Sequence, residues 1–199
     1  MKQLTILILC IYASILYFIF PSVDRGLCMA AMLVSAIGDM FLANVIKWKK
    51  CSLSNFVMGA SAFGVAHIIY AGAYLLKLKN SAVRICINTG TVAAISLCMA
   101  FLLLFQGICR YRRDYRYQKL IMAYVCLIAL NCAAVFTYAW ETGQRAGGAL
   151  WAVGAAVGAI SFLVSDVCLG LNRVAGMKGM YKLVWILYPI GQFLLITCG

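Results

Sequence analysis

Residues 148–171 read GALWAVGAAVGAISFLVSDVCLGL, an apolar stretch that contains no lysine or arginine and a single carboxylate, Asp166. A bilayer core about 30 Å thick requires roughly 20 residues of α-helix to cross it. The stretch is long enough to do so. Its apolar residues are continuous rather than alternating, which favours a helix over a strand of a membrane β-barrel. It therefore predicts a transmembrane helix.

Similar apolar blocks fill the rest of the chain. Hydrophobic residues make up 65% of the 199 positions, charged residues make up 11%, and the mean hydropathy is +0.97. A water-soluble domain cannot cover its surface with so little charge. We therefore predict an all-α integral membrane protein, a single bundle of seven transmembrane helices that forms one domain over residues 1–199. The predicted spans are 3–20, 27–46, 53–76, 84–108, 119–140, 148–171 and 181–198.

The basic residues predict the orientation of this multi-pass bundle. With these spans, 12 of the 17 lysines and arginines lie at the end that holds the N-terminus, most densely over Arg110–Lys119, and 5 lie at the other end. The positive-inside rule places the more basic end in the cytoplasm. We expect a cytoplasmic N-terminus, an external C-terminus and, in a bacterium, a location in the cell membrane. Because the net charge of +12 is explained by topology, we expect no nucleic-acid partner.

Two further features of the sequence could be mistaken for a signal peptide and for a set of paired or metal-binding cysteines. The first span follows the basic Lys2 as a signal peptide would, but no small-x-small cleavage site follows it, so we interpret it as a retained helix. The chain also has ten cysteines, yet none forms a C-x-x-C pair and most lie within spans, where a thiol acts as a small apolar group. We assign no metal site and no disulfide.

Three ionisable side chains lie deep in the predicted spans: Asp39, His67 and Asp166. Such groups are costly in hydrocarbon and usually functional. At 1.5 Å per residue, Asp39 lies about 10 Å and Asp166 about 8 Å from the cytoplasmic end of its span. We expect the two aspartates to face each other across a cavity open to the cytoplasmic leaflet. The alternative is that each only forms hydrogen bonds to a neighbouring helix and fixes packing.

Other polar and aromatic side chains recur at helical spacing. One such series, Tyr124, Asn131 and Tyr138, repeats every seven residues. Residues at such spacing share one face of a helix, and a stripe of this kind either packs in the core or lines a pocket. As pocket residues that bind substrate we select Ser35, Tyr70, Tyr124, Asn131, Tyr188 and Gln192.

An ordered set of short motifs runs along the chain. They are G-D-x-x-L at Gly38–Leu42, F-x-x-G at Phe56–Gly59, F-x-x-A-H-x-x-Y at Phe63–Tyr70, F-x-x-S-D at Phe162–Asp166, and a Tyr-rich last helix with Gly191-Gln192. This order resembles the YhhN family of membrane proteins, whose animal members are lysoplasmalogenases. Two features depart from the family pattern. The family typically has Ala-Gln in the last helix, and its eight spans begin one span before what resembles the first span here.

The resemblance implies a hydrolase that cleaves the vinyl-ether bond of lysoplasmalogens, the alkenyl glycerophosphoethanolamines or glycerophosphocholines, to a fatty aldehyde and a glycerophospho-alcohol. The reaction needs a proton donor and an anion that stabilises an oxocarbenium ion, as in glycosidases. Burial and mutual repulsion would keep one of Asp39 and Asp166 protonated and leave the other ionised. His67 would act with them, and with Tyr70 would orient a carboxylate or the water. Which aspartate is the acid stays open.

The implied partners are a lysophospholipid substrate and the lipid bilayer, with no cofactor; assembly into a homo-oligomer stays open. The main alternative function is a small-molecule or proton-coupled lipid transporter, because intramembrane carboxylates also relay protons. A non-catalytic scaffold and a hydrolase of a related lipid are further alternatives.

Overall fold

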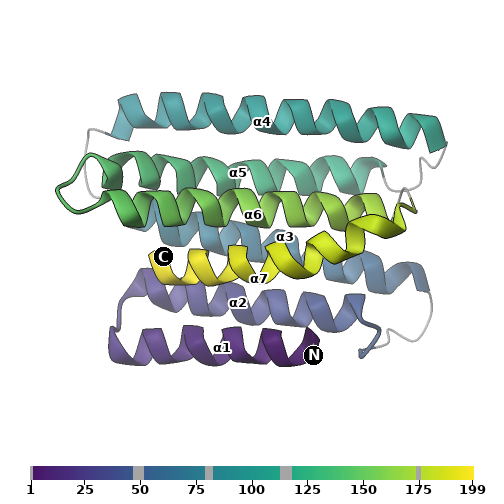
Figure 1. Cartoon of the computed structure of the whole chain (residues 1–199), viewed down its shortest axis with the longest axis horizontal. Helices are drawn as coiled ribbons and strands as arrows, with labels where there is room; N and C mark the ends of the chain where they lie inside the picture. The colour runs from purple at the N-terminus through teal and green to yellow at the C-terminus, as the bar shows by residue number, and fades with distance from the viewer. Residues whose placement is uncertain (1, 47–51, 79–82, 113–117, 174–175) are drawn as a thin grey trace.

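The computed structural model describes residues 2–46, 52–78, 83–112, 118–173 and 176–199, and within these ranges all regular secondary structure is helical (Figure 1). The seven predicted helices are confirmed. Helices α2 to α7 are each long and apolar enough to span a bilayer, whereas the apolar part of α1, Leu4–Ile19, is shorter. The helices are α1 (Lys2–Ile19), α2 (Val23–Leu42), α3 (Ser52–Leu76), α4 (Val83–Arg112), α5 (Gln118–Gly143), α6 (Ala149–Arg173) and α7 (Tyr181–Cys198), with a 3₁₀ turn, η1 (Lys178–Met180), before α7.

Consecutive helices run in opposite directions. The start of α1, the ends of α2, α4 and α6 and the starts of α3, α5 and α7 lie at one end of the bundle, called here the N-terminal end (Figure 1). This is the end to which the sequence assigns most of the basic residues. Part of that basic set lies outside the described residues: Lys47, Lys49, Lys50, Arg113 and Arg116.

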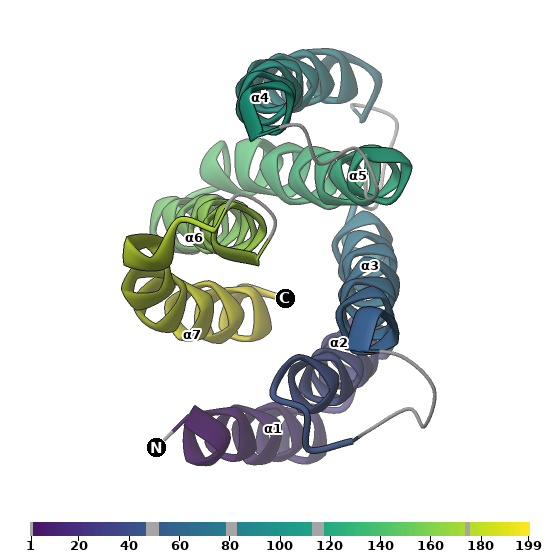
Figure 2. The ribbon, with the colours of Figure 1, turned by 90° about the vertical axis from the view of Figure 1, so that its right-hand side faces the viewer.

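The helices form an arc that partly surrounds a central pair. Helices α1, α2, α3 and α5 follow one another along the arc, α4 lies outside α5, and α6 and α7 lie inside (Figure 2). The closest pairings are α2 with α3 and α6 with α7, and α7 also contacts α1 and α2. Polar side chains of α2, α3, α5, α6 and α7 are buried in this arrangement, among them Ser35, His67, Asn131, Asp166 and Gln192.

Glycines bring the paired helices into close contact. A Cβ atom added at Gly59 of α3 would lie 3.1 Å from the carbonyl oxygen of Gly38 in α2. A Cβ atom added at Gly191 of α7 would lie 3.1 Å from the carbonyl oxygen of Gly158 in α6. Small residues allow this approach between membrane helices. The two crossings fix the neighbouring residues Asp39 and Gln192 in the interior.

Helix α2 is shifted toward the N-terminus relative to the predicted span 27–46. It begins after Ser22, whose hydroxyl oxygen accepts a hydrogen bond from the backbone N–H of Arg25. It ends at Leu42 because Asn44 has a positive φ of 57°. The backbone N–H of Asn44 donates to Phe41 and that of Val45 to Met40, the bond pattern of a Schellman motif.

Candidate active site

A chain of hydrogen bonds joins α5, α3 and α6 around Asp166. The Oδ2 atom of Asp166 lies 2.9 Å from Nε2 of His67 and accepts a second hydrogen bond from the hydroxyl of Tyr124, also at 2.9 Å. On the other side of the imidazole, Nδ2 of Asn131 lies 3.1 Å from Nδ1 of His67. The ring also packs against Phe162, with 4.7 Å between ring centroids. The histidine is 1% exposed, so these contacts fix its position.

The amide of Asn131 indicates which nitrogen of His67 carries the hydrogen. An amide nitrogen only donates hydrogen bonds, so Nδ1 accepts from Asn131 and Nε2–H donates to Asp166. Among the described residues, the buried Oδ1 atom of Asn131 receives no hydrogen bond. Rotation of this amide would present that oxygen to a hydrogen on Nδ1. The arrangement therefore suits both the neutral and the protonated imidazole.

Asp39 of α2 has a separate partner. Its Oδ2 atom accepts a hydrogen bond of 2.6 Å from the hydroxyl of Tyr188 in α7. The ring of Tyr188 lies edge-on to Phe63 and to Phe162, with centroid distances of 5.9 and 5.8 Å. Phe162 thus contacts both His67 and Tyr188, so it lies between the surroundings of the two aspartates.

Both aspartates line one cavity of about 780 Å³ between α1, α2, α3, α6 and α7. Its wall is mostly apolar, and its polar side chains come from α2, α6 and α7. Much of the lining belongs to the N-terminal end of the bundle, including Ile6 of α1, Ala43 after α2 and Tyr181 at the start of α7. A cavity with a few convergent polar groups in an apolar wall is typical of a small-molecule site.

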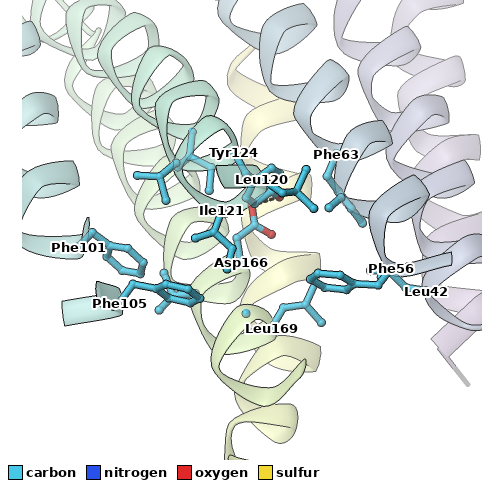
Figure 3. Close-up of a pocket in the computed structure, with 15 residues that line it drawn as sticks. Leu42, Phe56, Phe63, Phe101, Phe105, Leu120, Ile121, Tyr124, Asp166 and Leu169 are labelled. Carbon is cyan, nitrogen blue, oxygen red and sulfur yellow. Dashed lines mark hydrogen bonds between the residues drawn. The ribbon is translucent and has the colours of Figure 1, made fainter. Parts of the chain in front are cut away.

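A second, apolar pocket meets the first at Asp166. This pocket has a volume of about 50 Å³, and Figure 3 shows the Asp166 carboxylate among rings and aliphatic side chains of α3, α4 and α5. Leu42 and Phe63 also line both spaces. The Asp166 carboxylate therefore lies where a wide cavity that contains polar groups joins an apolar cleft.

The predicted site residues fall into two groups. Asp39, Asp166, Tyr124 and Tyr188 line one or both of these cavities. His67, Ser35, Tyr70, Asn131 and Gln192 are each no more than 1% exposed and line neither of the two.

Two of the buried residues bond to each other. The hydroxyl of Tyr70 in α3 donates to Oε1 of Gln192 in α7 at 2.5 Å. Among the described residues, Ser35 Oγ and Gln192 Nε2 are buried without a hydrogen-bond partner. Direct contact with substrate is therefore easiest for Tyr124 and Tyr188, and the substrate-binding roles of the deeper residues stay predictions.

Several lining residues were absent from the sequence-based prediction. Arg173, Tyr181 and Trp185 line the larger cavity, and Phe162 packs on His67. A signal for Arg173 was present, because it follows Asp166 by seven residues and residues at that spacing share a helix face. Tyr181 carried the same signal, because it precedes Tyr188 by seven residues, and Phe162 belongs to the F-x-x-S-D motif. Trp185 carried no comparable signal.

Both a family model and individual relatives match this chain. The sequence model of the YhhN family matches residues 1–198. Proteins named lysoplasmalogenase from Mycobacterium bovis and Mycobacterium tuberculosis are each 31% identical over 179 residues, which is 88% of this chain and 60% of the relative. Human lysoplasmalogenase TMEM86A is 30% identical over 160 residues, 77% of this chain and 55% of the relative. The chain thus spans about three fifths of the length of the relatives it matches. No solved structure matches it significantly.

Proposed function

The chain belongs to the YhhN family, and we propose that it hydrolyses the vinyl-ether bond of lysoplasmalogens to a fatty aldehyde and a glycerophospho-alcohol. The proposal is supported by the relatives named lysoplasmalogenase. The observation that carries it is the presence of two aspartates, Asp39 and Asp166, on the wall of one cavity with unequal sets of hydrogen-bond donors.

Vinyl-ether hydrolysis begins with proton transfer to carbon. A carboxylic acid donates its proton to the β-carbon of the double bond, and the carbon that bears the oxygen becomes an oxocarbenium ion. Water adds to that ion and loses a proton, giving a hemiacetal. The hemiacetal then breaks its bond to the glycerol oxygen, which leaves an aldehyde and an alcohol. One proton is taken from the acid and one is returned, so the net reactant is a single water molecule.

The hydrogen bonds favour different roles for the two aspartates. Among the described residues, Asp166 accepts from two donors, His67 and Tyr124, while Asp39 accepts from one, Tyr188. Hydrogen bonds to a carboxylate stabilise its charged form. We therefore assign Asp166 as the anion that stabilises the oxocarbenium ion and directs water, and Asp39 as the acid that protonates the β-carbon.

His67 supports the water step in this scheme. Its imidazole holds Asp166 through Nε2 and is itself held by Asn131 through Nδ1. A proton from the attacking water would pass to Asp166, be shared with His67, and then return across the shared cavity to Asp39, which regenerates the acid. The second nitrogen of His67 faces an amide that suits either protonation state. Because His67 lines neither cavity, we assign it an orienting role and not direct contact with substrate.

Isotope labelling tests the reaction directly. Purified protein incubated with a 1-alkenyl lysophospholipid in deuterated water should release a fatty aldehyde that carries one deuterium on the carbon next to the carbonyl, because that carbon receives the proton. Mass spectrometry of the aldehyde, trapped as a hydrazone, measures the label. The Asp39→Asn protein serves as the control for spontaneous acid hydrolysis. Intact lipid recovered after long incubation with the unmodified protein would reject the proposal and favour lipid transport.

A further inference from the structure

Arg173 places a positive charge on the wall of the cavity that holds both aspartates. It is the last residue of α6 and, of the described residues that line this cavity, the only basic one. It lies seven residues beyond Asp166, so the two share one face of the helix, about 10 Å apart along its axis. The cation thus lies about two helical turns closer than Asp166 to the N-terminal end of the bundle.

The guanidinium of Arg173 keeps most of its hydrogen-bonding capacity. Its Nη2 atom donates to the carbonyl oxygen of Leu42 at 3.1 Å. An arginine side chain has five N–H donors, so this bond leaves several for a ligand. Of the ion pairs formed by the described residues, none involves Arg173. Those with arginine or lysine join Lys77 to Asp24 and Arg145 to Glu141, near the opposite end of the bundle.

We propose that Arg173 binds the phosphate group of the lysophospholipid, an assignment that rests on the proposed function and adds the direction in which the substrate lies. The planar guanidinium fork matches the oxygens of a phosphate and pairs with two of them at once. In an extended lysoplasmalogen the oxygen-bearing carbon of the vinyl ether, which becomes the oxocarbenium centre beside Asp166, lies roughly 8 Å from the phosphorus, given ordinary bond lengths. This separation is close to the axial spacing of about 10 Å between Asp166 and Arg173, and the long arginine side chain can cover the difference.

The two cavities complete this orientation. With the phosphate at Arg173, the glycerol lies in the larger cavity and the vinyl ether reaches Asp166. The first carbons beyond the vinyl ether then enter the apolar pocket of about 50 Å³, where Phe101 and Phe105 of α4 and Phe56 of α3 lie around the carboxylate (Figure 3). The reverse orientation would put a charged phosphate among these rings, at a high desolvation cost.

The contact with Leu42 suggests a structural role that the test must separate from phosphate binding. A cation at the C-terminus of α2 stabilises the free carbonyl groups there. Arg173→Gln retains an amide that can donate to the Leu42 carbonyl but removes the charge, whereas Arg173→Lys retains the charge. Arg145→Gln is a matched control, because it removes an arginine from the opposite end of the bundle.

Binding of ligands that cannot be cleaved tests the assignment without relying on catalysis. A 1-O-alkyl lysophospholipid and a 1-O-alkylglycerol share the chain and glycerol, and only the first has a phosphate. The unmodified protein and Arg145→Gln should bind the phospholipid about tenfold or more tightly than the alkylglycerol, as expected for a charge-assisted contact. Arg173→Gln should lose most of this preference and bind the alkylglycerol normally, and Arg173→Lys should retain part of it.

The outcomes separate the two proposals. If Arg173→Gln retains the full preference, or loses affinity for both ligands equally, Arg173 does not bind the phosphate. If inorganic phosphate alone displaces the lipid completely, the cavity binds free phosphate and the assignment fails. If binding behaves as expected but no vinyl-ether lipid is cleaved, the phosphate site stands and the hydrolase proposal fails.

Discussion

The two aspartates make the sharpest prediction at the scale of single residues. Asp39→Asn and Asp166→Asn should each lower kcat by about a hundredfold or more, because the amide lacks the proton and the charge that the reaction needs. Each protein should remain folded and inserted, since a neutral amide is cheaper to bury than a carboxylate. Aldehyde release and thermal unfolding in detergent measure the two effects.

Asp24→Asn is the matched control for this pair. Asp24 lies in the first turn of α2 and forms an ion pair of 3.4 Å with Lys77, away from the cavity. Its substitution should leave kcat unchanged. Full activity in the Asp39→Asn protein would show that Asp39 is not the acid. Full activity in the Asp166→Asn protein would show that Asp166 is not the stabilising anion.

The contacts of His67 lead to a second prediction. His67→Ala should lower kcat roughly tenfold to a hundredfold, less than either aspartate substitution, because Asp166 keeps its bond from Tyr124. His67→Gln retains a donor and should recover part of the rate. Since the ring is buried, alanine should also lower the unfolding temperature. A rate loss equal in both variants would indicate that the imidazole itself transfers a proton.

Individual site residues were predictable only in part. The seven-residue spacing of Tyr124, Asn131 and Tyr138 correctly put the first two on one face, where they bond Asp166 and His67. The bond from Tyr188 to Asp39 was not predictable. It joins helices that are far apart in the sequence, and it depends on the rotation of each helix about its axis, which apolar periodicity does not specify in an almost uniformly apolar chain.

At the scale of helices, the sequence predicted the number of elements and their approximate bounds. Hydropathy locates a span well because a bilayer requires about 20 apolar residues. It locates ends poorly, as α2 shows. This helix stops at Leu42 because Asn44 adopts a left-handed conformation, although apolar residues continue to Ile46. Local backbone chemistry, and not hydrophobicity, decided that boundary.

The close crossing of α6 and α7 gives a prediction at the same scale. At Gly191, an added Cβ would lie 2.8 Å from the backbone nitrogen of Phe162, with little room to adjust. Gly191→Ala should therefore destabilise the bundle by about 1–3 kcal/mol, as overpacked interiors do. It should also reduce activity, because Phe162 and Tyr188 lie beside this crossing. Thermal unfolding and aldehyde release measure both effects.

Gly72 of α3 provides the comparison. Apart from its chain neighbours and the backbone of its own helix, no atom of the described residues lies within 4 Å of the position of an added Cβ there. Gly72→Ala should therefore cause no loss of stability, since alanine favours helix over glycine by up to about 1 kcal/mol. Equal destabilisation by both alanines would show that the crossing at Gly191 is not close in solution.

For the whole molecule, the alternating direction of successive helices was predictable from the sequence, but which helices pack against each other was not. Seven spans in sequence require successive helices to run in opposite directions, as Figure 1 shows. The sequence did not indicate that α4 lies outside α5 while α7 reaches α1 and α2. Helix pairing also depends on small-residue contacts, such as that of Gly38 in α2 with Gly59 in α3, and glycines occur on several helices without marking their partners.

The orientation of the bundle in the membrane is the remaining prediction at this scale. The sequence assigns 12 of the 17 lysines and arginines to the N-terminal end, so that end should face the cytoplasm. The cavity that holds Asp39, Asp166 and Arg173 would then receive substrate from the cytoplasmic leaflet. A reporter active only outside the cytoplasm should be active when fused after Gly199 and silent when inserted within Arg110–Lys119. A C-terminal reporter active only in the cytoplasm would reverse the orientation and place substrate entry on the external leaflet.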